Sequence, residues 1–344
     1  MSEQLLAERA EETTTPIARP RLGFLGVGWI GRHRLQAISR AACADILYVS
    51  DVSEDNVAEA AKCAPGSLPA ASLEDMLSSG LDGIVIATPN QLHMPQCLAA
   101  LEAGCAVFCQ KPLARTEEEV RAILSAAWKA DRLLGVDLSY RHVAGMQRIR
   151  QLVAEGALGE IYAVDLVFHN AYGPDKKWFF DMAQSGGGCM LDLGIHLIDL
   201  ALWTLGFPDV ATVSSRLFAQ GRQLYPGEEV VEDYGEARID LGTGASVRVV
   251  TSWNLHAGCD AIIEAHFHGT RGGASLRNVA GSFFDFQAEE YHGRQRVVLA
   301  QPPDDWGGRA AVAWARQLAS SPRYRPEADH LATVARVLDR IYGR

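Results

Sequence analysis

The feature that most constrains the fold is a short apolar run that ends in three glycines spaced G-x-G-x-x-G. The run covers residues 22–25, and the glycines follow at positions 26, 28 and 31. Such a run is typical of a buried strand in a parallel sheet, because that strand has no polar face. The glycines allow a tight turn, a close approach of the backbone to a pyrophosphate, and close packing of a helix whose free N–H groups attract an anion. The residues predicted to bind a dinucleotide here are Gly26, Gly28, Trp29, Ile30 and Gly31.

A second apolar run, residues 46–49, ends close to Asp51. Asp51 lies about 20 residues after the last glycine, the distance at which an acidic residue binds the adenosine ribose hydroxyls. The alternative is a solvated residue at the end of a strand. A carboxylate at this point repels the 2′-phosphate of NADP, and no Arg or Lys occurs in residues 52–55. We therefore expect NAD rather than NADP as the cofactor.

The composition is typical of a globular protein with one large domain or two ordinary ones. The chain has 344 residues, of which 48% are hydrophobic and 22% charged, and its formal charge is −10. This charge argues against nucleic acid or an anionic membrane as a partner, and we expect no membrane span. The seven cysteines show no paired spacing, and the N-terminus lacks the layout of a secretory signal. These patterns predict a cytoplasmic protein with reduced thiols and no bound metal.

Predicted strands and helices alternate from residue 22 to about residue 141. This alternation predicts an α/β fold in which residues 21–141 form a dinucleotide-binding Rossmann domain with a doubly wound parallel sheet. Beyond it, strand-like runs over 212–298 and helices over 190–205 and 328–342 predict an α+β domain with an antiparallel sheet pattern, covering residues 142–344. Residues 1–20 are polar and acidic, and we expect a flexible arm there.

Polar residues follow directly after several predicted strands of the first domain. Ligands of doubly wound sheets bind beyond the carboxyl ends of the strands. The further residues predicted to contact the cofactor are Thr88, Pro89, Asn90, His93, Gln110 and Lys111.

Lys111 precedes Pro112 at the end of the predicted strand over 106–109. A lysine at this position can donate a hydrogen bond to a substrate oxygen, and with a lowered pKa it can take part in proton transfer. The alternative is a surface lysine in a turn.

Asp192, His196 and Asp199 are spaced i, i+4 and i+7 in an otherwise apolar predicted helix. In an α-helix this spacing places all three on one face, where they need partners or a cleft. A histidine with a carboxylate one turn away is a candidate general acid/base with its orienting partner. The alternative is a buried structural histidine bonded to an aspartate.

Four motifs, in this order and spacing, resemble the Gfo/Idh/MocA family of oxidoreductases. They are the glycine loop, residues 87–93, the Lys111-Pro112 pair, and the segment from Gly186-Gly187-Gly188 to Asp199. The resemblance implies a nicotinamide-binding Rossmann domain, a C-terminal domain with a large open sheet, and sugar, cyclitol or related polyol substrates. It implies Lys111 and His196 as the catalytic pair, Asp192 as a substrate ligand that orients the site, and a cis Lys111–Pro112 peptide.

The chain departs from the resemblance at Gln110, where the family commonly has Glu. Gln retains the length and can bond a ribose hydroxyl or an amide, but it removes a negative charge beside Lys111 and so favours a lower pKa for that lysine. We expect His196 to take the hydroxyl proton of a substrate while hydride leaves to NAD, and Lys111 to stabilise the developing oxyanion.

The residues expected to contact the substrate follow from sequence motifs less directly than the cofactor residues do. Besides Lys111, Asp192 and His196, they are Arg141, Asn170 and Trp178, with Asp181 and His256 also near expected cleft edges. Trp178 stacks on a sugar face in one interpretation and anchors a loop in the other, and His256 is equally compatible with a sheet-surface residue. An open sheet usually needs covering, so we expect a homodimer or homotetramer through the C-terminal sheet.

Two other functions are compatible with the same motifs. The first is transient NAD redox chemistry in sugar elimination or glycoside hydrolysis. The second is a non-catalytic ligand-sensing regulator, against which the intact Lys111, Asp192 and His196 argue.

Overall fold

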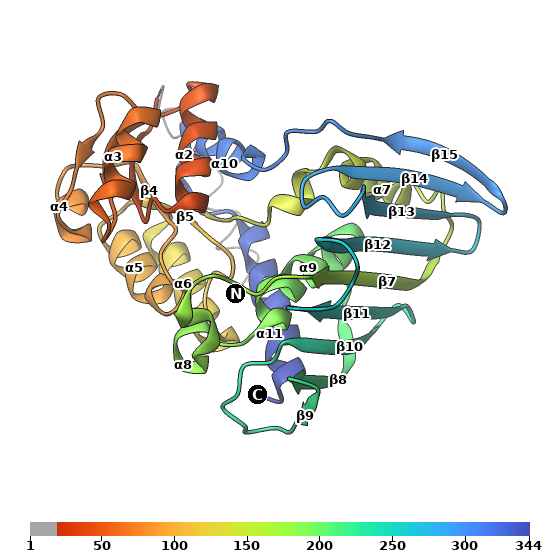
Figure 1. Ribbon diagram of the computed structural model, residues 1–344. Coiled ribbons are helices and arrows are strands. Elements are labelled where there is room, and N and C mark those ends of the chain that lie inside the picture. Colours follow the sequence, from red (N-terminus) through yellow and green to blue (C-terminus); the bar gives the residue numbers. More distant parts are fainter. Residues whose placement is uncertain (1–18) are drawn as a thin grey trace.

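The computed structural model describes residues 19–344, which build two sheets with helices packed around them (Figure 1). The arm predicted over residues 1–20 therefore lies outside the described residues, apart from Arg19 and Pro20. The first sheet has six parallel strands in the order β3-β2-β1-β4-β5-β6. The strands are β1 (Arg21–Leu25), β2 (Asp45–Ser50), β3 (Leu68–Pro69), β4 (Gly83–Ile86), β5 (Ala106–Cys109) and β6 (Leu134–Val136). This order is that of a Rossmann fold and confirms the predicted doubly wound sheet.

Helices follow the strands of this sheet as the alternating pattern predicts. They are α2 (Trp29–Ala41), α3 (Glu54–Cys63), α4 (Leu73–Leu77), α5 (Asn90–Glu102) and α6 (Glu117–Ala130). Side-chain oxygens of Ser53, Ser72 and Thr116 accept hydrogen bonds from main-chain N–H groups in the first turns of α3, α4 and α6. These caps satisfy donors that have no partner inside the helix, so the sequence fixes where each helix begins.

Helix α10 (Arg309–Ser320) returns from the far end of the chain to the Rossmann sheet, which the sequence analysis did not predict. Its Trp314 and Leu318 lie in one core with Leu22 and Phe24 of β1. A Cβ atom on Gly83 of β4 would lie 2.8 Å from both Trp314 and Leu318, so the glycine leaves the room that this helix occupies.

The second sheet is open and has nine strands in the order β15-β14-β13-β12-β7-β11-β10-β8-β9. In that order they cover Gln295–Ala300, Phe286–His292, Gly273–Asn278, Ala261–Gly269, Ile161–Asn170, Ser246–Ser252, Tyr234–Leu241, Val210–Ala219 and Arg222–Leu224. All neighbours are antiparallel except β7 and β11, which are parallel. The predicted large, mostly antiparallel sheet is confirmed. The parallel pairing of β7 with β11 could not be predicted from the periodicity of the strands.

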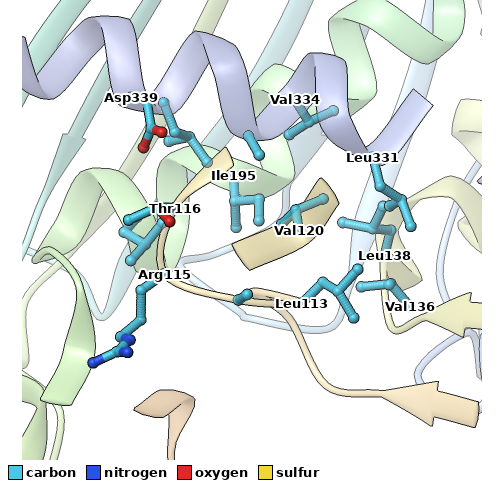
Figure 2. A pocket seen from close by; sticks show the side chains of 14 residues that line it. Leu113, Arg115, Thr116, Val120, Val136, Leu138, Ile195, Leu331, Val334 and Asp339 are labelled. Atoms are coloured by element: carbon cyan, nitrogen blue, oxygen red, sulfur yellow. The ribbon is translucent and has the colours of Figure 1, made fainter. Parts of the chain in front are cut away.

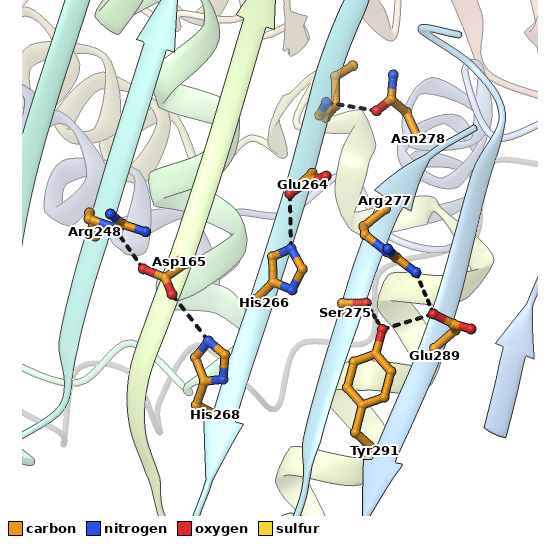
Figure 3. A network of polar contacts seen from close by, with 11 residues as sticks. Asp165, Arg248, Glu264, His266, His268, Ser275, Arg277, Asn278, Glu289 and Tyr291 are labelled. Carbon is orange, nitrogen blue, oxygen red and sulfur yellow. Dashed lines mark hydrogen bonds and ion pairs between the residues drawn. The ribbon is translucent and has the colours of Figure 1, made fainter. Parts of the chain in front are cut away.

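Helices cover one face of this sheet and leave the other open (Figure 1). The helices of this part are α7 (Ala144–Ala154), α8 (Met182–Ser185), α9 (Ile195–Thr204) and α11 (His330–Tyr342), with short turns at Ser139–His142, Lys177–Phe180, Met190–Gly194 and Pro326–Asp329. The open face carries polar pairs between strands (Figure 3), such as Asp165 with Arg248 at 2.8 Å and with His268 at 3.2 Å. Successive residues of a strand point to opposite faces of the sheet, so apolar residues face the helices and polar residues face the open side.

Within residues 19–344, one helical run, Met182–Thr204, is long and apolar enough by composition to cross a membrane. However, 94% of its apolar window is buried inside the fold. The run is therefore a core helix, packed between the nine-stranded sheet and α11.

Helices α6, α9 and α11 pack together in an apolar junction between the two sheets (Figure 2). Its cavity, lined by side chains such as Val120, Ile195 and Val334, has a volume of about 20 Å³. That volume accommodates about one water molecule, so the junction holds the two parts together and offers no substrate site.

Candidate active site

The glycine loop between β1 and α2 has the geometry that a dinucleotide site requires. Gly26 has φ +83°, and a Cβ atom on it would lie 2.5 Å from the carbonyl oxygen of Ala87. A Cβ atom on Gly31 would lie 2.0 Å from the carbonyl oxygen of Gly26, so these two glycines permit the tight turn and the close helix. Gly28 is different, because its nearest neighbour would be 4.0 Å away, at Asn56. Gly28 therefore leaves open space in front of the N-terminus of α2, where a pyrophosphate is stabilised.

Asp51 lies beside this loop, at the end of β2. Its Oδ2 accepts a hydrogen bond from Val27 N at 2.8 Å, and its Oδ1 accepts from Ser53 N at 3.0 Å and Asn56 Nδ2 at 3.1 Å. The position is the one expected of a ribose ligand, and the carboxylate also holds the glycine loop in place.

A cavity of about 350 Å³ lies where α2 faces the ends of β5 and β6. It brings together Trp29 and Ile30 of the glycine-loop helix, Gln110 and Lys111 after β5, His196 of α9, and Trp306 from the segment before α10. Gln110 and Lys111 were predicted at this edge of the sheet because they follow a strand. His196 and Trp306 join them only in the tertiary structure.

Lys111 pairs with Asp192 inside this region. Its Nζ donates to Oδ1 of Asp192 at 2.5 Å and to the carbonyl oxygen of the same residue at 2.8 Å. The Lys111–Pro112 peptide is cis, as expected. Trp253 Nε1 donates to the other carboxylate oxygen of Asp192 at 3.3 Å. Asp192 is therefore fixed from two sides and orients the lysine.

The prediction that Asp192 orients His196 is wrong. The i, i+4 and i+7 spacing gives one shared face only in a regular α-helix, but Met190–Gly194 forms a wider π-helical turn. The third residue of the supposed stripe, Asp199, accepts hydrogen bonds from the guanidinium of Arg141. Asp192 therefore pairs with Lys111 and Asp199 with Arg141, and neither carboxylate bonds to His196.

His196 is a buried, neutral histidine on the wall of the cavity. It is 8% exposed, and within the described residues its Nδ1 is enclosed and has no hydrogen-bond partner. Burial lowers the pKa of His196 well below its ordinary value, and the positive charges of Lys111 and Arg34 lower it further. His196 lines the cavity, and a neutral imidazole there can accept a proton.

Tyr140 is a cavity residue that the sequence analysis did not assign a role. Its ring lies 4.9 Å from that of His196 and equally close to that of Trp306. Burial raises the pKa of its hydroxyl, so Tyr140 remains a phenol. Its position directly before Arg141, after a strand, was a signal that was available in the sequence.

Comparison with known proteins identifies the family. Residues 21–138 match the family described as "Oxidoreductase family, NAD-binding Rossmann fold", and residues 146–275 match the GFO/IDH/MocA C-terminal domain. The chain is also 30% identical over 265 residues, 75% of its length, to the 1,5-anhydro-D-fructose reductase of Ensifer adhaerens, of which the match covers 76%. The chain belongs to the Gfo/Idh/MocA family.

Other proteins similar to this chain include two named dehydrogenases. The chain is 33% identical over 205 residues to the D-glucoside 3-dehydrogenase of Escherichia coli (strain K12), covering 57% of this chain and 58% of that enzyme, so the match spans a little over half of the relative. Among solved structures, GenD2 from gentamicin A biosynthesis in complex with NAD has a TM-score of 0.79 at 23% identity over 97% of both chains. Levoglucosan dehydrogenase with NADH and levoglucosan has a TM-score of 0.78 at 21% identity, covering 94% of this chain and 97% of that one. At these identities, the likeness to the two structures shows the fold.

The family's NAD-binding Rossmann domain fits the residues present here. The open space at Gly28, Asp51 and the cavity at Lys111 follow β1, β2 and β5, so all three lie at the carboxyl edge of the sheet. Among residues 19–344, no group of three or more His, Cys, Asp or Glu side chains could hold a metal ion.

Three predicted cofactor residues at the end of β4 are bonded within the protein. His93 is 1% exposed, and its ring nitrogens lie 2.8 Å and 2.7 Å from the carbonyl oxygens of Pro112 and Thr88. Asn90 Nδ2 donates to the carbonyl oxygen of Ser185 at 2.8 Å, and Thr88 Oγ1 donates to Gln96 at 2.6 Å. The expectation that the His93 ring contacts the cofactor does not fit this burial, and His93 instead ties the β4 and β5 ends together.

Of the predicted substrate residues, Lys111 and His196 line the Lys111 cavity, whereas Arg141, Asn170 and Trp178 do not. Arg141 is paired with Asp199, and Asn170 Oδ1 accepts from Tyr172 N at 2.8 Å. Trp178 stacks on Phe179 with ring centroids 3.8 Å apart. His256 lines a second cavity of about 440 Å³, which also contains Trp253. Since Trp253 bonds to Asp192, this second cavity adjoins the Lys111–Asp192 pair. The substrate roles of Arg141, Asn170 and Trp178 remain predictions.

Glu232 and Tyr342, which were not predicted from the sequence, contact the triple-glycine segment 186–188. Glu232 is buried and accepts hydrogen bonds from Gly188 N and Met190 N, both at 2.9 Å, and from the Tyr342 hydroxyl at 2.7 Å. A Cβ atom on Gly187 would lie 2.2 Å from the Tyr342 hydroxyl, and one on Gly188 would lie 1.9 Å from the carbonyl oxygen of Glu232. The glycines therefore allow this close contact, which fixes the start of the helix that carries Asp192 and His196.

Proposed function

We propose that this protein is an NAD-dependent dehydrogenase or reductase that transfers hydride between nicotinamide and a secondary alcohol or ketone of a sugar, cyclitol or related polyol. The observation that carries this proposal is the shared cavity of the glycine-loop helix, Lys111 and His196. A dinucleotide seated on the glycine loop has its reactive end directed toward the same carboxyl edge of the sheet as these two side chains.

The bound cofactor supplies the hydride acceptor or donor. In the oxidative direction, neutral His196 accepts the hydroxyl proton of the substrate. Lys111 donates a hydrogen bond to the substrate oxygen and stabilises the negative charge that develops there. Asp192 holds the lysine ammonium in place through its carboxylate and its carbonyl oxygen. In the reductive direction, the imidazolium returns the proton to the oxygen.

The substrate class is supported by the relatives, which include a D-glucoside 3-dehydrogenase and a 1,5-anhydro-D-fructose reductase. Polar and aromatic groups around Asp192, such as Trp253 and His256 at the second cavity, are of the kind that bind polyols. We place substrate binding, as well as subunit contacts, in residues 142–344, and the cofactor in residues 21–141.

The experiment is an assay of NADH absorbance with a panel of sugars, cyclitols and their keto forms. We expect turnover with at least one of them, and we expect Lys111→Ala to reduce kcat by about two to four orders of magnitude while NADH still binds. The exposed Lys62, paired with Glu59 on α3, provides the matched control Lys62→Ala, which should leave turnover unchanged. Turnover of Lys111→Ala close to that of the wild type would contradict the assignment.

The same assay separates the two other functions. Transient redox chemistry releases an altered sugar without net NADH, which product analysis by mass spectrometry detects. A ligand-sensing regulator binds NAD and a sugar but forms neither NADH nor product.

We also propose that the protein works in the cytoplasm as a homodimer or homotetramer that covers the open face of the nine-stranded sheet. The polar network on this face (Figure 3) would then lie in a polar interface, with charged pairs setting the register between subunits. Light scattering after gel filtration measures the mass. A monomer at micromolar concentration, or an oligomer undisturbed by Asp165→Lys, would contradict this interface.

A further inference from the structure

Behind Lys111, three polar side chains from different elements meet in a buried cluster. Arg34 of α2 donates from Nε to Oδ2 of Asp137 at 2.5 Å, and Gln110 donates from Nε2 to the same oxygen at 2.6 Å. The side chain of Asp137 is 0% exposed and that of Arg34 is 7% exposed. All three residues line the cavity of Lys111 and His196. This cluster is not used by the reaction steps described above.

The cluster determines which way the Gln110 amide points. The amide has an NH₂ group that donates and a carbonyl oxygen that accepts, and its hydrogen-bond partners show which of the two faces each neighbour. An aspartate paired with an arginine is a carboxylate, which only accepts hydrogen bonds. The NH₂ group of Gln110 therefore faces Asp137. The carbonyl oxygen Oε1 then points away from Asp137, toward the cavity. Within the described part of the chain, Oε1 has no hydrogen-bond partner, and it is absent from the fully enclosed unpaired atoms.

We propose that Asp137 is a positioning residue for the nicotinamide end of the cofactor. It turns the amide of Gln110 so that Oε1 faces the cavity as an uncharged acceptor for a donor on that end, either a ribose hydroxyl or the carboxamide N–H₂. The proposal rests on the placement of the nicotinamide beside Lys111 in the proposed function. Asp137 acts only through Gln110, because its own carboxylate is enclosed.

The same cluster gives a physical reason for Gln at this position. A glutamate at position 110 would place a second carboxylate where the amide now lies 2.6 Å from Asp137. Two carboxylates at that distance do not both ionise, and they would compete for the single guanidinium of Arg34. The negative charge therefore lies at the end of β6, in Asp137, and residue 110 supplies only the acceptor oxygen.

The test is a reciprocal exchange of the amide and the carboxylate. The variants are Asp137→Asn, Gln110→Glu and the double variant with both changes. We expect each single variant to weaken NADH binding about tenfold, since a fixed hydrogen bond is lost or opposed. For Gln110→Glu the loss should diminish as pH is lowered, because one of the two carboxylates then takes up a proton. The double variant keeps one amide, one carboxylate and Arg34, and should bind NADH within about threefold of the wild type.

ADP is the probe that separates positioning from a general structural effect, because it contains neither the nicotinamide nor the ribose that carries it. Its affinity, measured by calorimetry, should be unchanged in all three variants. If Asp137→Asn does not fold, Gln110→Met makes the same prediction, since it removes the amide and leaves the ion pair with Arg34. Unchanged NADH affinity in the single variants, equal losses for NADH and ADP, or a double variant as weak as the single ones would overturn the proposal.

A cofactor analogue distinguishes the two donors. In 3-acetylpyridine adenine dinucleotide an acetyl group replaces the carboxamide and removes its N–H₂. If the carboxamide is the donor, Asp137→Asn should have little effect on the analogue; if the ribose hydroxyl is the donor, it should weaken NADH and analogue equally. Failure of the hydride-transfer proposal is seen separately, as absence of turnover with every substrate despite this binding pattern.

Discussion

The ammonium of Lys111 lies 2.5 Å from Oδ1 and 2.8 Å from the main-chain carbonyl oxygen of Asp192. The lysine follows β5 of the Rossmann sheet, and the aspartate lies 81 residues later, in the π-helical turn before α9. A lysine ammonium has three donors. Within residues 19–344 these two acceptors are its hydrogen-bond partners, so one N–H remains for a substrate oxygen.

Asp192→Asn should reduce kcat/KM by about a hundredfold, because the neutral amide no longer holds and balances the ammonium. NADH binding should be unchanged, as measured by fluorescence titration. The control is Asp45→Asn, at the start of β2, where the half-exposed side chain pairs with Arg19 away from the Lys111 cavity. A kcat/KM for Asp192→Asn within twofold of the wild type would show that the ion pair has no part in the reaction.

The pH dependence should follow His196. Its folded pKa is well below the ordinary value of 6.5, so the base remains neutral and oxidation should lose activity only under clearly acidic conditions. The unfolded chain binds this proton at a higher pH than the folded chain does, so stability is present above about pH 6.5 and falls as pH drops below it. Burial lowers the pKa of His93 as well, which adds to the same trend.

Urea unfolding of the wild type and His196→Gln at about pH 7.5 and about pH 5.5 measures this linkage. The wild type should lose more stability between the two conditions than the variant does. His256→Gln, at the second cavity, is the control and should behave like the wild type. Equal losses in the wild type and His196→Gln would exclude His196 as a source of the acid sensitivity.

Tyr342→Phe should destabilise the fold by about 1–3 kcal/mol. The change removes the hydroxyl that donates to the buried Glu232 at 2.7 Å and accepts from Leu191 N at 3.0 Å. Chemical denaturation gives the free energy of unfolding. Tyr225→Phe is the matched control, because Tyr225 is 65% exposed and should give no change. A Tyr342→Phe protein as stable as this control would mean that Glu232 is held without the tyrosine.

Asp51→Ala should weaken NAD binding and improve binding of NADP relative to NAD. The change removes a ribose acceptor and the charge that repels a 2′-phosphate. The ratio of Michaelis constants for the two cofactors measures the effect, and Asp55→Ala, an exposed residue in the first turn of α3, is the control. A wild type that prefers NADP would contradict the role of Asp51.

Local patterns in the sequence predicted much of the fold and part of the site. The parallel sheet followed from apolar runs separated by helical segments, and the position of Lys111 followed from its place directly after such a run. Asp137 also follows a strand directly, so the same reasoning extends to it. By contrast, α10 has an apolar face that packs against Leu22 and Phe24 of β1, about 290 residues earlier in the chain, and no local pattern identifies that partner.

The sequence by itself determined the elements and the glycine loop, because turn geometry, helix capping and apolar periodicity act between near neighbours in the chain. It also placed Asp51 and Lys111 at one edge of the sheet, since both follow strands of that sheet, whereas His196 lies on α9 and reaches the same cavity only in the tertiary structure. Only the tertiary structure decided which charged groups pair. The π-helical turn directs Asp192 to Lys111, Asp199 binds Arg141, and Asp137 orients Gln110. The physical reason is that a buried charge must find a partner wherever packing provides one, and packing joins residues that the sequence keeps far apart.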